Sequence, residues 1–265
     1  MPSLQAAFIV ALCIMLPLLE VPRWRRLKAN STSAARLGHY REVIVLLWAL
    51  AAVSAWLAAP ATLFDAPGRL GGMEWLTGSA TASWLVQGGA LLLVGMLTAQ
   101  ALRSLTDEEV RQQYALAAQP LKFMLPAGRR ERRWWIVVAI SAGVCEELVY
   151  RGFMLAYFGQ PGTGLGLGLG GAWLLSTLAF GLVHAYQGLA GVLRSGIVGG
   201  LLGLVAIASG HLALAIVLHV VIDLLPLAYY RPAEGSVEGV AEVGDQVGRV
   251  LDADRNPDQG VGDTH

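Results

Sequence analysis

The sequence has few charged residues for its length. Only 14% of its 265 residues are Asp, Glu, Lys or Arg, whereas 55% are hydrophobic. A soluble domain carries about 25% charged residues. Lysine is nearly absent, since only Lys28 and Lys122 occur and arginine supplies the other positive charges. This composition excludes an ordinary soluble domain and indicates a protein that crosses a membrane several times.

Cysteines and familiar hydrolase motifs are also scarce. Cys13 and Cys145 are the two cysteines, and both lie in apolar runs, so no disulfide framework is predicted. The first residues lack the positive charge of a secretory signal, and we therefore expect the first apolar run to stay in the membrane. The sequence contains neither HExxH nor GxSxG, so it predicts neither a zincin nor a GxSxG-type serine hydrolase.

Seven apolar segments have roughly the length of a membrane-spanning helix, which needs about 20 residues. They are residues 4–19, 43–64, 80–102, 134–158, 172–189, 192–208 and 212–230. The predicted fold class is therefore all-α, a multi-pass transmembrane helical bundle of about seven spans. Residues 231–265 are polar and acidic, and we predict a disordered cytoplasmic tail.

Positive charges gather in two of the connections, and they predict the topology. They are Arg23, Arg25, Arg26, Lys28, Arg36 and Arg41 in the first, and Arg103, Arg111, Lys122, Arg129, Arg130, Arg132 and Arg133 in the second. Arginine and lysine favour cytoplasmic loops, so the N-terminus is expected outside and the C-terminus inside. We divide the chain into N-terminal membrane helices with their cytoplasmic connection (1–125), a core (126–230) and the tail (231–265).

A small set of ionisable side chains lies inside the apolar segments, where each costs a few kcal/mol, about 3 on insertion scales. They are Glu146, Glu147, Arg151, His184, His219 and Asp223. The predicted spans place the glutamates and both histidines at overlapping depths, between the middle and the inner half of the bilayer. Three helices are therefore expected to bring them together.

Helical spacing separates the two glutamates. Glu147 and Arg151 are four residues apart and face each other on one side of a helix, where they can pair. Glu146 lies about 100° around the helix and has no basic partner on its own face. His219 and Asp223 are also four apart. Arg194, near the inner end of its segment, is expected to extend its guanidinium toward the interface.

Two kinds of chemistry fit this set, and a structural interpretation stands beside them. A carboxylate and two imidazoles can activate water and protonate a leaving amine, or they can bind Zn²⁺ through three ligands. Alternatively, each histidine is a hydrogen-bonded interior residue, and Glu147 with Arg151 is a structural ion pair.

The residues form three motifs that resemble a known family. They are Glu146-Glu147-x-x-x-Arg151, Phe180-x-x-x-His184 and His219-x-x-x-Asp223. In this order they resemble the CAAX protease and bacteriocin-processing family, intramembrane proteases related to the Rce1-type prenyl protease. The resemblance covers about residues 126–230 and implies a helical intramembrane endopeptidase.

The resemblance also implies a role for each site residue. Glu146 and His184 would activate a water molecule, and His219 and Asp223 would stabilise the oxyanion. The prenyl protease has Asn at the position of Asp223. A carboxyl group donates a hydrogen bond to an oxyanion only when it is protonated, so Asp223 otherwise orients His219.

Three further residues are implied as support for the catalytic groups. Glu147 and Arg151 form the supporting pair, and Phe180 accompanies them in the second motif. The cofactor is left open between a divalent metal such as Zn²⁺, held by Glu146, His184 and His219, and no cofactor.

We predict an integral membrane protein of the bacterial inner membrane that hydrolyses a peptide or protein substrate. Its expected partners are that substrate and the lipid bilayer, and no nucleic acid. The sequence does not identify the substrate or say whether it is prenylated.

Two alternatives from other classes are a proton-coupled transporter and a non-catalytic scaffold or bacteriocin-immunity protein. A paired internal repeat, which many transporters have, is not apparent.

Overall fold

The computed structural model describes residues 2–58, 73–161 and 164–230, and every regular element within them is a helix. Met1–Tyr230 forms one compact unit. The predicted disordered tail and the last residues of the second predicted span, 59–64, lie outside the described residues.

Seven long helical segments occur in the described residues. The first joins α1 (Pro2–Val10), η1 (Ala11–Met15) and α2 (Leu16–Ala29); the second is α3 (Ser33–Leu57) and the third is α5 (Ala80–Arg103). The fourth joins α7 (Arg129–Glu146), η4 (Glu147–Met154) and α8 (Leu155–Gly159). The fifth joins α9 (Gly168–Val183) to η5 (His184–Gln187), the sixth is α10 (Leu189–Ser209), and the seventh joins α11 (Ala213–Leu224) to α12 (Pro226–Tyr229). Short elements between them are α4 (Glu74–Thr77), α6 (Glu108–Ala117) and η3 (Gln119–Leu121).

Five helical segments of the described residues are long and apolar enough to cross a membrane. The segment 129–159 is long enough, but Glu146, Glu147 and Arg151 interrupt its apolar character. The seventh segment, Ala213–Tyr229, is apolar but shorter. The prediction of an all-α multi-pass bundle is confirmed, whereas the number of spans and their orientation stay predictions.

Polar side chains fix the starts of several helices. The Thr32 hydroxyl accepts a hydrogen bond from the Ala35 amide at the start of α3, and Ser79 does the same for Ala82 at the start of α5. Asp107 accepts two amide hydrogen bonds at the start of α6. Each cap satisfies N–H groups that have no partner within their helix.

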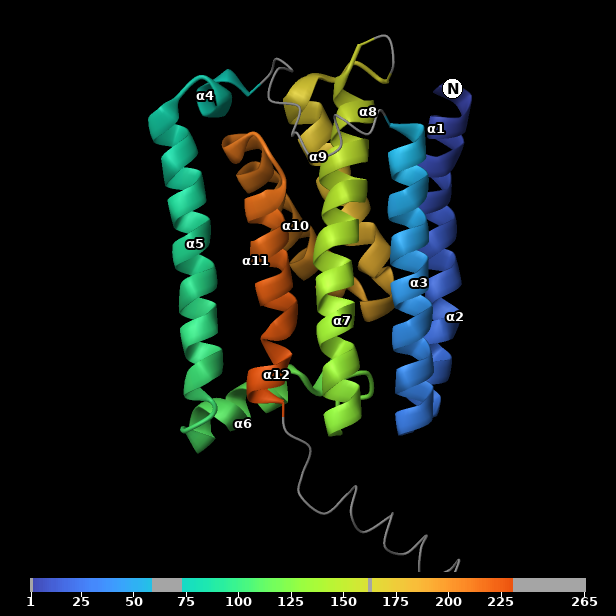
Figure 1. Cartoon of the computed structure of the whole chain (residues 1–265), viewed down its shortest axis with the longest axis vertical. Helices are drawn as coiled ribbons and strands as arrows, with labels where there is room; N and C mark the ends of the chain where they lie inside the picture. The colour runs from blue at the N-terminus through green and yellow to red at the C-terminus, as the bar shows by residue number, and fades with distance from the viewer. Residues whose placement is uncertain (1, 59–72, 162–163, 231–265) are drawn as a thin grey trace, which may run out of the picture. The chain divides into compact units, whose positions relative to one another are not determined.

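The long helices lie side by side (Figure 1). The helices α4 and α8 lie at one end of the bundle, and α6 and α12 lie at the other. The connections from α2 to α3 and from α5 to α7 lie at the α6 end, and most of the basic residues belong to the helix ends that these basic connections join. The predicted topology requires both basic connections at one end of the bundle.

The helix α7 packs between α3 and α11, and a glycine allows it to approach α11 closely. A Cβ atom at Gly143 would overlap Val220 Cγ2 and lie 3.0 Å from the Val220 backbone nitrogen. A larger residue would therefore separate the two helices. Since Glu146 is on α7 and His219 is on α11, this contact sets the distance between two of the predicted site residues.

Apolar side chains fill the interior around η4 and also cover the outside. Phe153, Met154 and Leu155 are at most 2% exposed. On the outer surface, Trp84 and Leu85 of α5 are 73% and 71% exposed. Large exposed apolar side chains on several helices are unfavourable in water but match the hydrocarbon of a bilayer.

Candidate active site

The first predicted motif lies where the helix changes its geometry. Glu146 is the last residue of the α-helix α7, and Glu147 begins the π-helix η4. The amide of Leu155 accordingly bonds to the carbonyl of Tyr150, five residues earlier. Short π-helical stretches are rare and often occur at functional sites. Sequence spacing predicted an uninterrupted α-helix here, because no residue pattern distinguishes the two.

The Glu147–Arg151 ion pair predicted from spacing is present. Arg151 Nη1 donates to Glu147 Oε1 at 2.8 Å, and both side chains are at most 1% exposed. Arg151 Nη2 also donates to the carbonyl of Gly199 on α10 at 2.6 Å, and the guanidinium lies over the Phe180 ring at 4.4 Å. Arg151 therefore links η4 to both α9 and α10.

His219 is surrounded by carboxylates from two helical segments. Its Nδ1 lies 2.8 Å from Glu147 Oε1, and a carboxylate only accepts, so Nδ1–H is the donor. Its Nε2 lies 3.7 Å from Glu146 Oε2 and 3.7 Å from Asp223 Oδ2. The predicted neighbours His219 and Asp223 are thus brought together with Glu146. The contact with Glu147 was not predicted.

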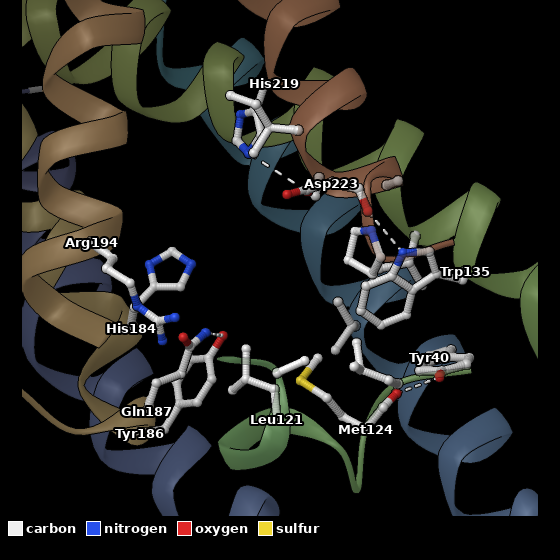
Figure 2. Close-up of a pocket in the computed structure, with 18 of the residues that line it drawn as sticks. Tyr40, Leu121, Met124, Trp135, His184, Tyr186, Gln187, Arg194, His219 and Asp223 are labelled. Atoms are coloured by element: carbon white, nitrogen blue, oxygen red, sulfur yellow. Dashed lines mark hydrogen bonds and ion pairs between the residues drawn. The ribbon is translucent and has the colours of Figure 1, made fainter. Parts of the chain in front are cut away.

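His184 lies on the opposite wall of the same space, as Figure 2 shows. Its Nδ1 is 2.8 Å from the Phe180 carbonyl, which can only accept, so Nδ1 carries a hydrogen. The Phe180 ring centroid lies 5.0 Å from that of His184 and 5.9 Å from that of His219. Phe180 therefore packs against both imidazoles and against Arg151.

The fifth segment ends differently from the prediction of one span over 172–189. The α-helix α9 ends at Val183, and η5 begins at His184. Gly188 has a φ of 78°, which a right-handed helix cannot contain and which glycine adopts without strain. The next helix, α10, consequently begins at Leu189 rather than at 192.

A cavity of about 620 Å³ connects the predicted site residues. Glu146, His184, His219 and Asp223 all line it, whereas Glu147 and Arg151 lie behind its wall. The rest of the lining is mainly apolar and aromatic. It includes Trp24 of α2, Tyr40 of α3, Leu97 of α5, Leu121 and Met124 near η3, and Trp135 of α7. The N-terminal helices therefore help to form the cavity.

Several polar and aromatic residues of the cavity were not predicted to belong to the site, and four of them lie near the predicted site residues. Gln187 Nε2 donates to the Tyr186 hydroxyl at 3.2 Å, and Trp135 Nε1 donates to the Asp223 carbonyl at 2.8 Å. Arg194 also lines the cavity, rather than only reaching toward an interface. Tyr186 and Gln187 lie two and three residues after His184 in the sequence, and this proximity is the signal that could have indicated them.

The metal hypothesis is not supported by the geometry. The described part of the chain contains no group of three or more His, Cys, Asp or Glu side chains arranged to hold a metal ion. In particular, His184 lies across the cavity from His219 (Figure 2). The proposed ligand set Glu146, His184 and His219 therefore does not converge, and no chemical step below uses a metal.

Residues 130–225 match the family model for type II CAAX prenyl endopeptidases, Rce1-like. The chain carries an Rce1-like domain. The match confirms the resemblance to the CAAX protease family over these residues, which are about a third of the chain. No curated protein and no solved structure matches the chain.

The Rce1-like domain extends from the start of α7 to the residue after α11. It lies within the predicted core, 126–230, and includes all seven predicted site residues. The division of the chain into domains and the roles of those residues stay predictions.

Proposed function

We propose that the protein is an intramembrane endopeptidase that hydrolyses a peptide bond of a membrane-associated or peptide substrate. One observation carries this proposal: Glu146, His184, His219 and Asp223, from three helical segments of the Rce1-like domain, line one cavity. Peptide hydrolysis by an activated water requires a group that takes and returns a proton, and polar groups that stabilise the oxyanion, on one cavity.

Glu146 acts as the general base, with His184 as its partner. The Glu146 side chain is 18% exposed, whereas Glu147 is fully buried, so Glu146 is the glutamate that reaches the cavity. With Nδ1–H bound to Phe180, the neutral His184 ring presents a lone pair on Nε2. A water molecule can donate to both groups. It loses a proton to Glu146 as its oxygen attacks the substrate carbonyl carbon, and Glu146 then protonates the leaving amine.

His219 and Asp223 stabilise the oxyanion of the tetrahedral intermediate. Because His219 Nδ1–H donates to Glu147, only a second ring proton makes Nε2 a donor. Asp223, whose Oδ2 lies 3.7 Å from Nε2, is a donor only when protonated. A single proton held on either group therefore supplies the donor that the oxyanion needs.

Glu147 and Arg151 hold this arrangement in place. Arg151 neutralises Glu147 and ties it to the Gly199 carbonyl, while Glu147 holds His219 through Nδ1. A buried carboxylate with two charge-assisted partners keeps one orientation. The supporting pair therefore fixes the tautomer and direction of the His219 ring.

The cavity favours an apolar substrate segment that is reached from the cytoplasmic side. Most of its lining is apolar or aromatic, and it extends toward the end of the bundle that carries α6 and the basic connections. The positive-inside rule assigns that end to the cytoplasm. We further propose, as the sequence analysis predicted, that this membrane is the inner membrane of a bacterial cell.

The test is cleavage profiling in membranes that contain the wild type or Glu146→Gln. Loss of a general base lowers the rate about 10²- to 10⁴-fold. Cleavage by the variant should therefore fall to background, while its abundance in the membrane equals that of the wild type. Glu109→Gln is the matched control, because Glu109 is exposed on α6 and does not line the cavity. Cleavage by Glu146→Gln at the wild-type rate would contradict the proposal and favour a transporter or a scaffold.

A further inference from the structure

We propose that Tyr186 is a substrate-binding residue whose hydroxyl donates a hydrogen bond to a main-chain carbonyl adjacent to the scissile one. This inference rests on the proposed function and adds a residue to its site. Three observations support it: the contacts that hold the Tyr186 side chain, the unused hydrogen of its hydroxyl, and the wall of the cavity on which it lies.

The ring of Tyr186 packs against two other rings. Its centroid lies 4.6 Å from that of Trp24 and 5.8 Å from that of His184. Trp24 is 9% exposed and packs edge-on against Phe123, with the centroids 4.5 Å apart. Aromatic pairs at such distances favour specific arrangements of their rings. Tyr186 is therefore held in part by α2, which lies outside the residues 130–225 of the Rce1-like domain.

The hydroxyl of Tyr186 keeps a hydrogen that it can donate. Gln187 Nε2 donates to the hydroxyl oxygen at 3.2 Å, so this bond uses a lone pair of the oxygen and leaves the O–H group free. That hydrogen has no acceptor in the part of the chain that the structure describes. An unpaired donor in a mainly apolar cavity is costly, so a ligand that accepts from it is stabilised. Tyr186 lines the 620 Å³ cavity, where a substrate can reach it.

Tyr186 lies on the wall of the cavity that faces the oxyanion groups. Figure 2 shows Tyr186 and His184 on one side, and His219 and Asp223 across from them. In the proposed reaction the scissile carbonyl oxygen points toward His219 and Asp223. Successive carbonyl groups of an extended chain point in opposite directions. A carbonyl adjacent to the scissile one therefore points toward the wall that carries Tyr186.

A main-chain carbonyl in this cavity needs a donor. Most of the lining is apolar or aromatic, and burying a carbonyl without a hydrogen bond is unfavourable. Arg194 is a second donor on the same wall (Figure 2), but it is exposed and its Nε bonds to the Ala190 carbonyl of its own helix. Tyr186 is held by neighbouring rings and by Gln187, so it is the donor with a fixed position. Every peptide has this carbonyl, so the contact places the scissile bond without selecting a side chain.

The experiment uses the full-length protein in phosphatidylcholine vesicles and a leucine-rich fluorescent peptide whose cleavage site is mapped by mass spectrometry. A set of peptides then carries a single thioamide in place of each other carbonyl in turn, because sulfur accepts hydrogen bonds more weakly than oxygen. On the unmodified peptide, Tyr186→Phe should raise KM about 3- to 10-fold, the range for one neutral hydrogen bond, with little change in kcat.

The coupling between the two changes identifies the contact. For the wild type, the thioamide adjacent to the scissile bond should raise KM, and for Tyr186→Phe it should cause no further rise. Thioamides elsewhere should act equally on both proteins. Trp24→Leu, which removes a ring that holds Tyr186, should weaken the same coupling. Tyr157→Phe is the matched control, since it also removes a tyrosine hydroxyl, but Tyr157 on α8 does not line the cavity.

Three outcomes overturn the inference. Additive effects at every carbonyl would mean that Tyr186 does not contact the main chain. An equal loss of kcat on all peptides, together with lower abundance in the membrane, would mean that Tyr186 only supports the fold. Coupling of the thioamide to Arg194→Gln instead of Tyr186→Phe would assign the carbonyl to Arg194.

Binding of the same peptides separates this inference from the proposed function. Fluorescence anisotropy with Glu146→Gln, alone and combined with Tyr186→Phe, should show the same coupling in Kd. Coupling in binding without cleavage by the wild type would refute the protease and retain the contact with Tyr186. Cleavage by the wild type without any coupling would retain the protease and refute the contact.

Discussion

The imidazole of His219 on α11 donates from Nδ1 to Glu147 at 2.8 Å, and the same carboxylate oxygen accepts from Arg151 at 2.8 Å. Glu147 therefore belongs to two interactions at once. It neutralises a buried arginine, and it orients a histidine that faces the cavity. The ion pair and the candidate catalytic groups form one connected network rather than two separate features.

Glu147→Ala should lower both stability and cleavage. It leaves Arg151 buried without its carboxylate, and removing one partner of a buried ion pair costs about 3–5 kcal/mol. It also frees His219 Nδ1. Unfolding by denaturant in detergent micelles measures the first effect, and peptide cleavage measures the second. Glu146→Gln provides the contrast, since its stability should stay within about 1 kcal/mol of the wild type while cleavage is lost.

The ion pair between Arg36 and Glu131 should stabilise the fold without contributing to chemistry. Arg36 donates from Nε and Nη2 to the two oxygens of Glu131, which is 2% exposed and also accepts from the Ala127 amide. Glu131→Ala should therefore destabilise the protein by about 3–5 kcal/mol. At a temperature where the variant is still folded, its KM should equal that of the wild type. A changed KM at full folding would contradict this assignment.

Much of the site follows from local spacing. In each of the pairs Glu147–Arg151 and His219–Asp223, the two residues lie four positions apart in the same helical segment. A contact between such residues is predicted correctly even when the helix boundaries are slightly wrong. The π-helical geometry of η4 did not disrupt the first pair, because both side chains still reach each other. The all-α fold likewise follows from long apolar runs, which depend on composition rather than on packing.

Contacts between helices could not be predicted in the same way. The bond from His219 to Glu147 depends on how closely α7 approaches α11, and this is decided at Gly143 and Val220. The position of Arg194 depends on where α10 begins and how it is rotated about its axis. A single sequence contains neither the axial shift nor the rotation of one helix against another, so it could not show that Arg194 also lines the cavity.

Treatment with a chelator should leave cleavage unchanged. The candidate ligands Glu146, His184 and His219 do not converge on one point among the described residues. Peptide cleavage in membranes with and without 1,10-phenanthroline measures this directly. A loss of activity that added Zn²⁺ restores would contradict the metal-free mechanism and require the site residues to move together.

Gly199→Ala should disturb the supporting network from the side of α10. A Cβ atom at this position would overlap Phe180 Cδ1 and lie 2.8 Å from Arg151 Nη2, whose bond to the Gly199 carbonyl it would displace. Overpacking a filled interior costs about 1–3 kcal/mol. Because Phe180 also packs against His184 and His219, we expect kcat to fall together with stability.

The matched control for this substitution is Gly95→Ala. Gly95 also lies within a long helix, α5, but nothing lies within 4 Å of a Cβ atom placed there. Alanine is favoured over glycine in a helix by about 0.5–1 kcal/mol, so this variant should be at least as stable as the wild type and equally active. If both glycine variants behaved alike in thermal unfolding and in kcat, the loss would reflect a general sensitivity of the helices. A loss confined to Gly199→Ala would instead show that Arg151, Phe180 and the two histidines depend on the space that this glycine leaves free.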